Sequence, residues 1–328
     1  MTVKMNKPKY IFFSGFPDYW KIANEDLLHN EEVFVCDGIN IPFSNLINGE
    51  PVVWRWGGVR RLPLKPLWYN FYTCAPLFDK EKKQYAVFTE NNSISFSKRF
   101  LNRLRTDYPN LVMLFEFTNV YGKNDNLRRL SQVSKYYDHI ITFNESDSRQ
   151  YGFRFHRLCY SYREPEESDA PYTDMLFIGQ DKGRLPYLLS IYDHVTQLGL
   201  KCSFYIANVA ADKQVARKGI IYNRWIPYRE VLRHVSHTRC ILEILEDQSN
   251  YFSLRTFEAL VYKKKLITAN PSVLKADFYS PSQMLYIQSA KDITREFFEM
   301  PVTNEYDVAA LSPNAKLPEY AKLYRTKP

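Results

Sequence analysis

The stretch DMLFIGQDKGR, residues 174–184, joins an apolar run to a turn with two glycines and two cations, in a chain that has only 11 glycines. Four consecutive apolar residues, 175–178, are typical of a strand covered on both faces. We expect this strand to end at Gly179, where a glycine allows a tight turn and close approach of a ligand. Ligands of doubly wound sheets bind beyond the carboxyl ends of strands.

Lys182 and Arg184 follow in the same turn, beside the expected start of a helix. The free N–H groups of a helix start favour anions, and two cations strengthen that preference. The pattern predicts a phosphate or diphosphate site. A turn with two solvated cations fits equally well, because a short glycine-containing turn is a weak signal by itself.

Similar apolar runs alternate with helical patterns along the whole chain, which indicates mostly parallel sheets with helices on both faces. The runs include YIFFSGF (10–16), EVFVCDG (32–38), PVVWRW (51–56), QYAVFTE (84–90), NLVMLFEF (110–117), YDHIITFN (137–144), CSFYIA (202–207), RCILEIL (239–245) and KLITAN (265–270). A polar segment with two prolines, residues 161–173, interrupts the rhythm and marks a domain boundary. The expected fold is α/β with two Rossmann-like doubly wound domains.

A second stretch, residues 241–270, reads ILEILEDQSNYFSLRTFEALVYKKKLITAN. Ser253 is a suitable N-cap for a helix that carries Arg255, Thr256 and Glu258 in its first turns. Arg255 and Glu258 are three residues apart and therefore share a helix face. Arg255 is suited to phosphate and Glu258 to two ribose hydroxyls. Alternatively, Glu258 complements the helix dipole and pairs with Arg255.

Between these stretches lies NRWIPYREVL, residues 223–232. Trp225, Pro227 and Tyr228 form a rigid aromatic turn before a helix, against which a nucleotide base can lie. An ordinary strand-to-helix loop with a tryptophan in the core is the equal alternative.

FIGQDKGR, WIPYREVL and ILEILEDQS…LRTFEAL…KKLITAN, in this order, resemble the C-terminal domain of bacterial GT-B glycosyltransferases. The most similar group is the lipopolysaccharide and capsule biosynthesis proteins, related to the CgeB-like glycosyltransferases. LFEFTNVYG (114–122) and the Tyr-rich stretch 136–161 extend the resemblance, which covers about residues 110 to 290.

This resemblance implies two Rossmann-like domains that face a cleft. An acceptor-binding domain would span residues 1–165, a nucleotide-sugar domain 166–291, and a final segment, 292–328, would return towards the first domain. The donor would be a nucleotide-diphosphate sugar, with UDP favoured, and the acceptor a saccharide or lipid-linked saccharide. Gly179, Lys182, Arg184, Arg255 and the helix start at Ser253 would then face the diphosphate, with Glu258 on the ribose.

One departure from the family pattern lies at Asn250-Tyr251-Phe252, where small residues and a glycine are usual. Bulky side chains there would narrow the sugar pocket, change the donor or weaken the site. The last outcome keeps a non-catalytic GT-B-like scaffold or partner protein open as the alternative function. Asn250 also stands where many retaining GT-B enzymes have the first of two glutamates, so retaining chemistry of that kind is not expected.

Glycosyl transfer needs a stabilised diphosphate leaving group, which cations and helix dipoles can supply. The chain has no DxD triplet, so we expect no metal and no cofactor. An inverting reaction also needs a general base at the acceptor hydroxyl. Three acidic residues near strand ends are alternative candidates: Asp18, Glu90 and Glu116. Glu116 lies within a strand and is equally compatible with a structural ion pair.

The net charge of +8 suits acidic partners, but no nucleic-acid-binding signature occurs. Residues 52–72 combine cations with tryptophans and would serve as an acceptor loop, an anionic-lipid contact or an exposed basic loop. Five widely spaced cysteines without a CxxC pair indicate free thiols and a reducing compartment. No run approaches the ~18 apolar residues of a membrane span. These features favour a cytoplasmic protein, including one held peripherally at the inner face of the cytoplasmic membrane.

Overall fold

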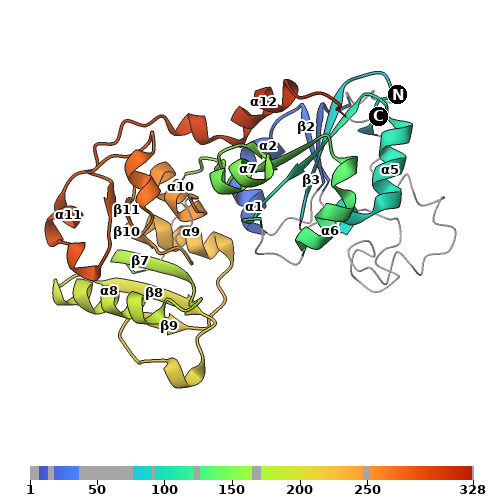
Figure 1. The fold of residues 1–328 in the computed structure, drawn as a ribbon. Coiled ribbons are helices and arrows are strands. Elements are labelled where there is room, and N and C mark those ends of the chain that lie inside the picture. Colours follow the sequence, from blue (N-terminus) through green and yellow to red (C-terminus); the bar gives the residue numbers. More distant parts are fainter. Residues whose placement is uncertain are drawn as a thin grey trace, which may run out of the picture. The chain divides into compact units, whose positions relative to one another are not determined.

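Two compact units make up the computed structural model (Figure 1). The described residues are 7–13, 18–36, 77–90, 93–121, 126–164, 171–246 and 251–326. The first unit comprises Met1–Arg157 with Pro313–Pro328, and the second comprises Leu158–Ser312. The boundary expected at 165/166 therefore lies earlier in the chain, and the segment that rejoins the first unit begins at 313 rather than 292.

The first unit contains a parallel sheet with the order β2-β1-β3-β4-β5-β6 in the described part of the chain. Its strands are β1 (Tyr10–Phe13), β2 (Val33–Cys36), β3 (Gln84–Thr89), β4 (Leu111–Glu116), β5 (His139–Thr142) and β6 (Arg154–Phe155). Its α-helices are α1 (Asp18–Ala23), α2 (Glu25–Leu28), α5 (Lys98–Asp107), α6 (Asn126–Val133), α7 (Glu145–Tyr151) and α12 (Leu317–Ala321).

The apolar runs of this sheet are continuous because both faces are buried. Ile11 and Phe13 of β1 belong to a hydrophobic cluster on one face. Tyr10 and Phe12, the alternate residues, belong to a cluster on the other face. A strand alternates its side chains between two faces, so a doubly covered strand needs apolar residues at every position.

The C-terminal segment is built into the first unit. Leu317 of α12 packs in the same cluster as Tyr10 and Phe12, and the Tyr10 hydroxyl donates a hydrogen bond to the Leu317 carbonyl at 2.9 Å. The preceding residue, Lys316, is buried and pairs with Glu116 at the end of β4, with 2.9 Å between Nζ and Oε1. Glu116 thus forms the structural ion pair that was the alternative to a role as general base.

Replacing Lys316 with methionine should lower the free energy of unfolding by about 2–3 kcal/mol, because Glu116 would keep its charge without a counter-ion in a largely buried position. The double variant Lys316→Met/Glu116→Gln should recover part of that loss. Urea unfolding of the two variants and the wild type measures both values. Equal stability of the single variant and the wild type would show that this ion pair does not anchor the C-terminal segment.

The second unit has a parallel sheet with the order β12-β11-β10-β7-β8-β9. Its strands are β7 (Thr173–Gln180), β8 (Cys202–Ala207), β9 (Ile220–Tyr222), β10 (Thr238–Glu243), β11 (Lys265–Thr268) and β12 (Met284–Tyr286). Its α-helices are α8 (Leu185–Gln197), α9 (Tyr228–Ser236), α10 (Leu254–Val261) and α11 (Arg295–Glu299). The chain runs outward from β7 to β9 and then returns to β10 on the other side of β7, as in a Rossmann sheet.

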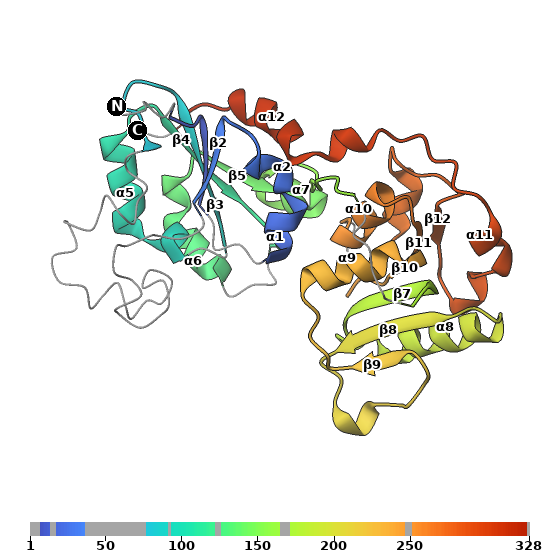
Figure 2. The same ribbon diagram turned by 180° about the vertical axis from the view of Figure 1, so that it is seen from behind.

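Helices cover both faces of this second sheet (Figures 1 and 2). Side chains of α8 and α11 share a core cluster with Met175 and Phe177 of β7. Helices α9 and α10 pack against β10. The two parallel sheets confirm the prediction of two Rossmann-like doubly wound domains.

The cysteines differ in part from the expectation of free thiols. Cys36 is disulfide-bonded, whereas Cys159, Cys202 and Cys240 are free. Pairing depends on distance in the folded chain, which the wide spacing in sequence does not show. None of the described helices is long and apolar enough to cross a membrane. The basic aromatic segment 52–72 lies outside the described residues.

Candidate functional site

The strand order of the second sheet reverses between β7 and β10, which are paired neighbours. In open α/β sheets, ligands bind at such a reversal, outside the carboxyl ends of the strands. The loop after β7, the loop after β9 and the start of α10 after β10 all lie at this carboxyl edge. They carry most of the predicted donor-binding residues.

The turn after β7 is held in shape by its own residues. Lys182 and Gly183 both have left-handed backbone conformations, with φ of 47° and 80°, and glycine adopts such a conformation without the steric cost that other residues meet. Asp181 binds the first N–H of helix α8, because its Oδ1 accepts a hydrogen bond from the Leu185 N–H at 2.7 Å. The Asp181 carboxylate therefore occupies the Leu185 N–H, one of the helix-start N–H groups that the sequence pattern predicted would bind a ligand phosphate.

Lys182 remains available at the surface of this turn. Its Nζ lies 2.9 Å from Oε2 of Glu246, which follows β10, and both side chains are partly exposed. An exposed ion pair of this kind contributes little stability. Lys182 can therefore leave Glu246 for a ligand phosphate at small cost.

Gly179 is not part of the turn, because β7 continues through Gln180. A Cβ atom at this position would lie 3.0 Å from the ring of Phe177. The expectation that Gly179 ends the strand is wrong. The absence of a side chain at Gly179 leaves room for the buried ring of Phe177, which lies on the same face of the strand.

Arg184 is engaged by the backbone. Its guanidinium donates to the carbonyls of Asp181, at 3.0 Å, and of Gln180 and Ile244. These contacts tie the end of β7 to the segment that follows β10. Burial lowers the pKa of Arg184, with nearby carboxylates opposing that effect. The contacts with the carbonyls use three of the five guanidinium N–H groups, so the predicted phosphate contact is limited to the remaining two.

Glu258 lies at the centre of a buried network and is 0% exposed. One carboxylate oxygen accepts from the Tyr228 hydroxyl and the other from Arg255. The hydroxyls of Tyr228 and Tyr160 are in turn 3.0 Å apart. Burial raises the pKa of Glu258, and the Arg255 charge opposes this increase. In this arrangement both oxygens of Glu258 already accept a hydrogen bond, and the buried side chain offers neither of them to a ribose. The structure shows the alternative interpretation of the sequence, in which Glu258 pairs with Arg255.

Glu243, the last residue of β10, is a buried carboxylate that the sequence analysis did not identify. It accepts hydrogen bonds from the hydroxyls of Ser253, of Thr256 at 2.8 Å and of Thr268 at 2.7 Å. Ser253 is also the N-cap of α10 and accepts from the Arg255 N–H at 3.1 Å. Glu243 therefore positions the start of α10. The sequence does contain a signal for this role: Glu243 ends an apolar strand, and Ser253 and Thr256 lie at the start of the next helix.

Thr256 is fully buried against Glu243, so its predicted contact with a donor is not available in this arrangement.

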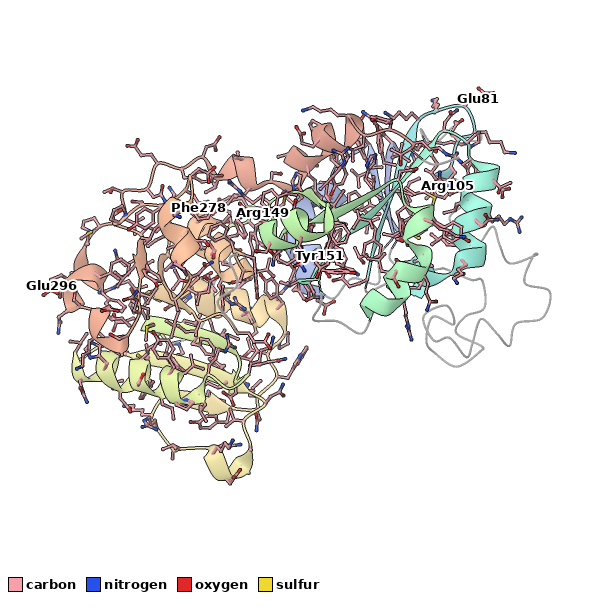
Figure 3. The ribbon with its side chains drawn as sticks, viewed as in Figure 1. Glu81, Arg105, Arg149, Tyr151, Phe278 and Glu296 are labelled. Carbon is pink, nitrogen blue, oxygen red and sulfur yellow. The ribbon has the colours of Figure 1, made fainter. Side chains whose placement is uncertain are left out.

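Tyr251 and Phe252, the bulky residues that depart from the family pattern, are both partly buried. The Phe252 ring contacts that of Phe278, with centroids 4.9 Å apart, and Figure 3 labels Phe278 within the second unit. Phe252 is thus partly buried and packs on the buried ring of Phe278. Asn250 lies outside the described residues.

Trp225 is the most exposed large hydrophobic residue of the described chain, at 78%. It lies between β9 and α9, and Pro227, two residues later, occupies the N-cap position of α9. The structure excludes the alternative of a core tryptophan. An exposed indole at the carboxyl edge of a Rossmann sheet presents a flat apolar face to a ligand.

In the first unit, Glu90 follows β3 directly, at the carboxyl edge where the described strand order reverses between β1 and β3. Thr118 donates to it through its N–H at 3.0 Å and its hydroxyl at 2.7 Å, and Asn119 donates through its amide at 3.0 Å. Burial raises the pKa of Glu90, and the hydrogen bonds from Thr118 and Asn119 oppose this increase. Asp18 begins α1 after β1 and is exposed.

No protein-family model matches the sequence, and no curated protein matches it. Solved structures resemble it in fold. A structure described as a putative UDP-N-acetylglucosamine 2-epimerase from Listeria monocytogenes has 9% sequence identity and a TM-score of 0.52, and the match covers 98% of this chain and 99% of that one. The apo lipopolysaccharide outer core galactosyltransferase WaaB has 14% identity, 96% and 100% coverage and a TM-score of 0.48. The glycosyltransferase SnogD from Streptomyces nogalater has 11% identity, 95% and 92% coverage and a TM-score of 0.41.

At these identities the likeness concerns the fold alone. Together with the strand orders, it agrees with the GT-B fold class expected from the sequence. No group of histidine, cysteine and acidic residues suited to a metal ion occurs among the described residues.

Proposed function

We propose that the chain is a glycosyltransferase that moves a sugar from a nucleotide-diphosphate donor, most simply a UDP-sugar, to a saccharide acceptor in surface polysaccharide or lipopolysaccharide synthesis. The observation that carries this proposal is the set of side chains at the carboxyl edge of the second sheet. Trp225 offers an exposed ring and Lys182 a loosely paired ammonium, on loops that follow β9 and β7. An aromatic face and a cation at the same edge of the sheet suit a nucleotide base and its phosphates.

The network of Tyr160, Tyr228, Glu258 and Arg255 would give this site its rigidity. The Arg255 side chain is 20% exposed although its partner Glu258 is fully buried. It can therefore keep its ion pair and still present one edge of the guanidinium to a diphosphate. The positive charge of Lys182 and Arg255 would stabilise the diphosphate as the bond to the sugar breaks.

The first unit would hold the saccharide or lipid-linked acceptor, and Glu90 is the preferred general base among the three candidates. Glu116 is committed to Lys316, and Asp18 is exposed, without partners among the described residues that would hold it in place. A raised pKa makes Glu90 a stronger base than an ordinary glutamate. In an inverting reaction Glu90 would take the acceptor hydroxyl proton while the acceptor oxygen attacks the sugar.

Thermal unfolding in the presence of UDP, GDP, CMP, dTDP and their sugars tests the donor site. A nucleotide at a hundred times its Kd should add about 2.7 kcal/mol of stability. Replacing Trp225 with alanine should weaken binding of that nucleotide about tenfold, since stacking of a base on an aromatic ring contributes ~1–3 kcal/mol.

Leu274→Ala is the matched control, because Leu274 is another exposed apolar side chain of the second unit. It should leave nucleotide binding unchanged. Stabilisation by one nucleotide that survives in Trp225→Ala would exclude the tryptophan from the site. If no nucleotide stabilises the wild type, the non-catalytic scaffold becomes the preferred function.

A further inference from the structure

A basic pocket opens at the opposite, amino edge of the second sheet, with a volume of about 490 Å³. We call it the amino-edge pocket. It lies where β7, β10 and β11 begin, so the length of the strands separates it from the loops of the proposed donor site. The residues on which the following argument depends are Arg239, Lys263, Lys264, Lys265, Phe298 and Met300.

The short connection from α10 to β11 brings three consecutive lysines to this edge. Helix α10 ends at Val261 and β11 begins at Lys265. Lys263 has a left-handed backbone conformation, with φ of 51°. Lys265 is in register with Cys240 of β10, which follows Arg239 directly. Parallel strands begin at a common edge, and so Arg239 and the lysines line one pocket.

The positive charge of the pocket is poorly compensated. Lys264 and Lys265 donate to the carbonyls of Ser236 and Ser282, at 2.8 and 2.6 Å, and not to carboxylates. Burial lowers the pKa of both lysines, as expected where a positive charge lacks a nearby negative one. The Lys263 side chain is exposed and makes no ion pair with any described residue.

The acidic groups nearby already have partners. Glu299, the only carboxylate of the pocket lining, is 2.8 Å from Arg295. Asp174 lies 3.7 Å from Arg239, whose Nε also donates to the Tyr172 hydroxyl at 3.3 Å. Arg239 is thus partly neutralised by Asp174, whereas the three lysines have no carboxylate partner among the described residues. Such a surface concentrates anions.

Apolar side chains form another part of the pocket lining. Phe298 and Met300 belong to α11 and the residue after it, and Met300 is among the exposed hydrophobic residues. Figure 3 labels Glu296, which marks this short helix at the rim of the second unit. We propose that the amino-edge pocket binds a phosphate-bearing ligand whose apolar part lies against α11, at a site separate from the donor site.

Two sources of this chemistry, a free phosphate compound and a lipid headgroup, are distinguished by two probes. Inorganic pyrophosphate is titrated calorimetrically, and vesicles of phosphatidylcholine with phosphatidylglycerol are tested by co-sedimentation. The test variant is Arg239→Gln/Lys263→Gln, because both side chains are accessible to a ligand. The control variant, Lys275→Gln/Lys291→Gln, removes the same charge from exposed positions outside the pocket.

We expect at least tenfold weaker binding of one probe by the test variant, a change below twofold in the control, and weaker binding of that probe at high salt. Loss of pyrophosphate binding assigns a free phosphate compound, and loss of vesicle binding alone assigns a lipid headgroup. The proposal is overturned if neither probe binds, or if both variants weaken binding equally. Pyrophosphate binding that persists in the test variant but disappears in Lys182→Ala also overturns it, because the anion then occupies the other edge. Unchanged melting temperatures of the free variants show that they remain folded.

Discussion

The variant Glu258→Ala is expected to lose about 3–5 kcal/mol of unfolding free energy in the absence of any ligand. Its carboxylate is fully buried and accepts from both Arg255 and Tyr228. Removal leaves a largely buried arginine without its counter-ion and a buried tyrosine hydroxyl with one partner fewer, and breaking a buried pair from one side costs this much. Urea unfolding, followed by tryptophan fluorescence and circular dichroism, measures the loss.

The matched control is Glu246→Ala, which removes the carboxylate partner of Lys182. That pair is partly exposed, and the expected change is below about 1 kcal/mol. Glu258→Gln should fall between the two, because the amide keeps a hydrogen bond to Tyr228 but loses the charge that pairs with Arg255. Comparable stability of Glu258→Ala and Glu246→Ala would show that the buried network does not support the second unit.

This expectation changes how donor binding must be tested. If a Glu258 variant failed to bind nucleotide, the cause could equally be a disturbed helix α10 or the loss of a direct contact with the ribose. Trp225 does not share this ambiguity, because its exposed ring contributes little to the core. Lys182 is similarly suitable, since its ion pair with Glu246 is partly exposed.

The fold could be predicted from sequence because it depends on periodicity. The runs at 10–13 and 175–178 are apolar at every position, and both lie in strands whose two faces are buried. The position of the proposed site depends on the same rhythm, since Lys182 and the Ser253 cap come after strands and therefore lie at the carboxyl edge.

The roles of individual side chains depend on partners far along the chain. Arg184 is held by the Ile244 carbonyl, 60 residues away, and Glu258 by Tyr228, 30 residues away. Neither partner is visible in a local motif, so a cation after a glycine and a glutamate on a helix face were both assigned to a ligand. The expectation that Gly179 ends β7 was wrong for a different reason. Glycine is needed at this position because a side chain would meet the Phe177 ring, and not because the chain turns there.

Replacing Glu90 with glutamine should reduce the turnover number by about 10²–10⁴-fold, the usual contribution of general acid–base catalysis. The amide has nearly the same shape, and its oxygen can still accept from Thr118 and Asn119, whose groups hold Glu90 at the end of β3. Nucleotide binding should be unchanged, because the donor residues belong to the second unit. Transfer rates and nucleotide-induced thermal shifts are measured on the same preparation.

The pH dependence separates a base from a structural carboxylate at this position. A base acts in its deprotonated form, so kcat/KM of the wild type should rise with pH through the pKa of Glu90. Burial raises that pKa, which moves the acidic limb of the profile above the ordinary glutamate value of ~4.3. The residual activity of Glu90→Gln should lack this limb, whereas Asp18→Asn should retain it together with most of the wild-type rate. A limb that persists in Glu90→Gln and disappears in Asp18→Asn would transfer the role of base to Asp18, the exposed carboxylate at the start of α1.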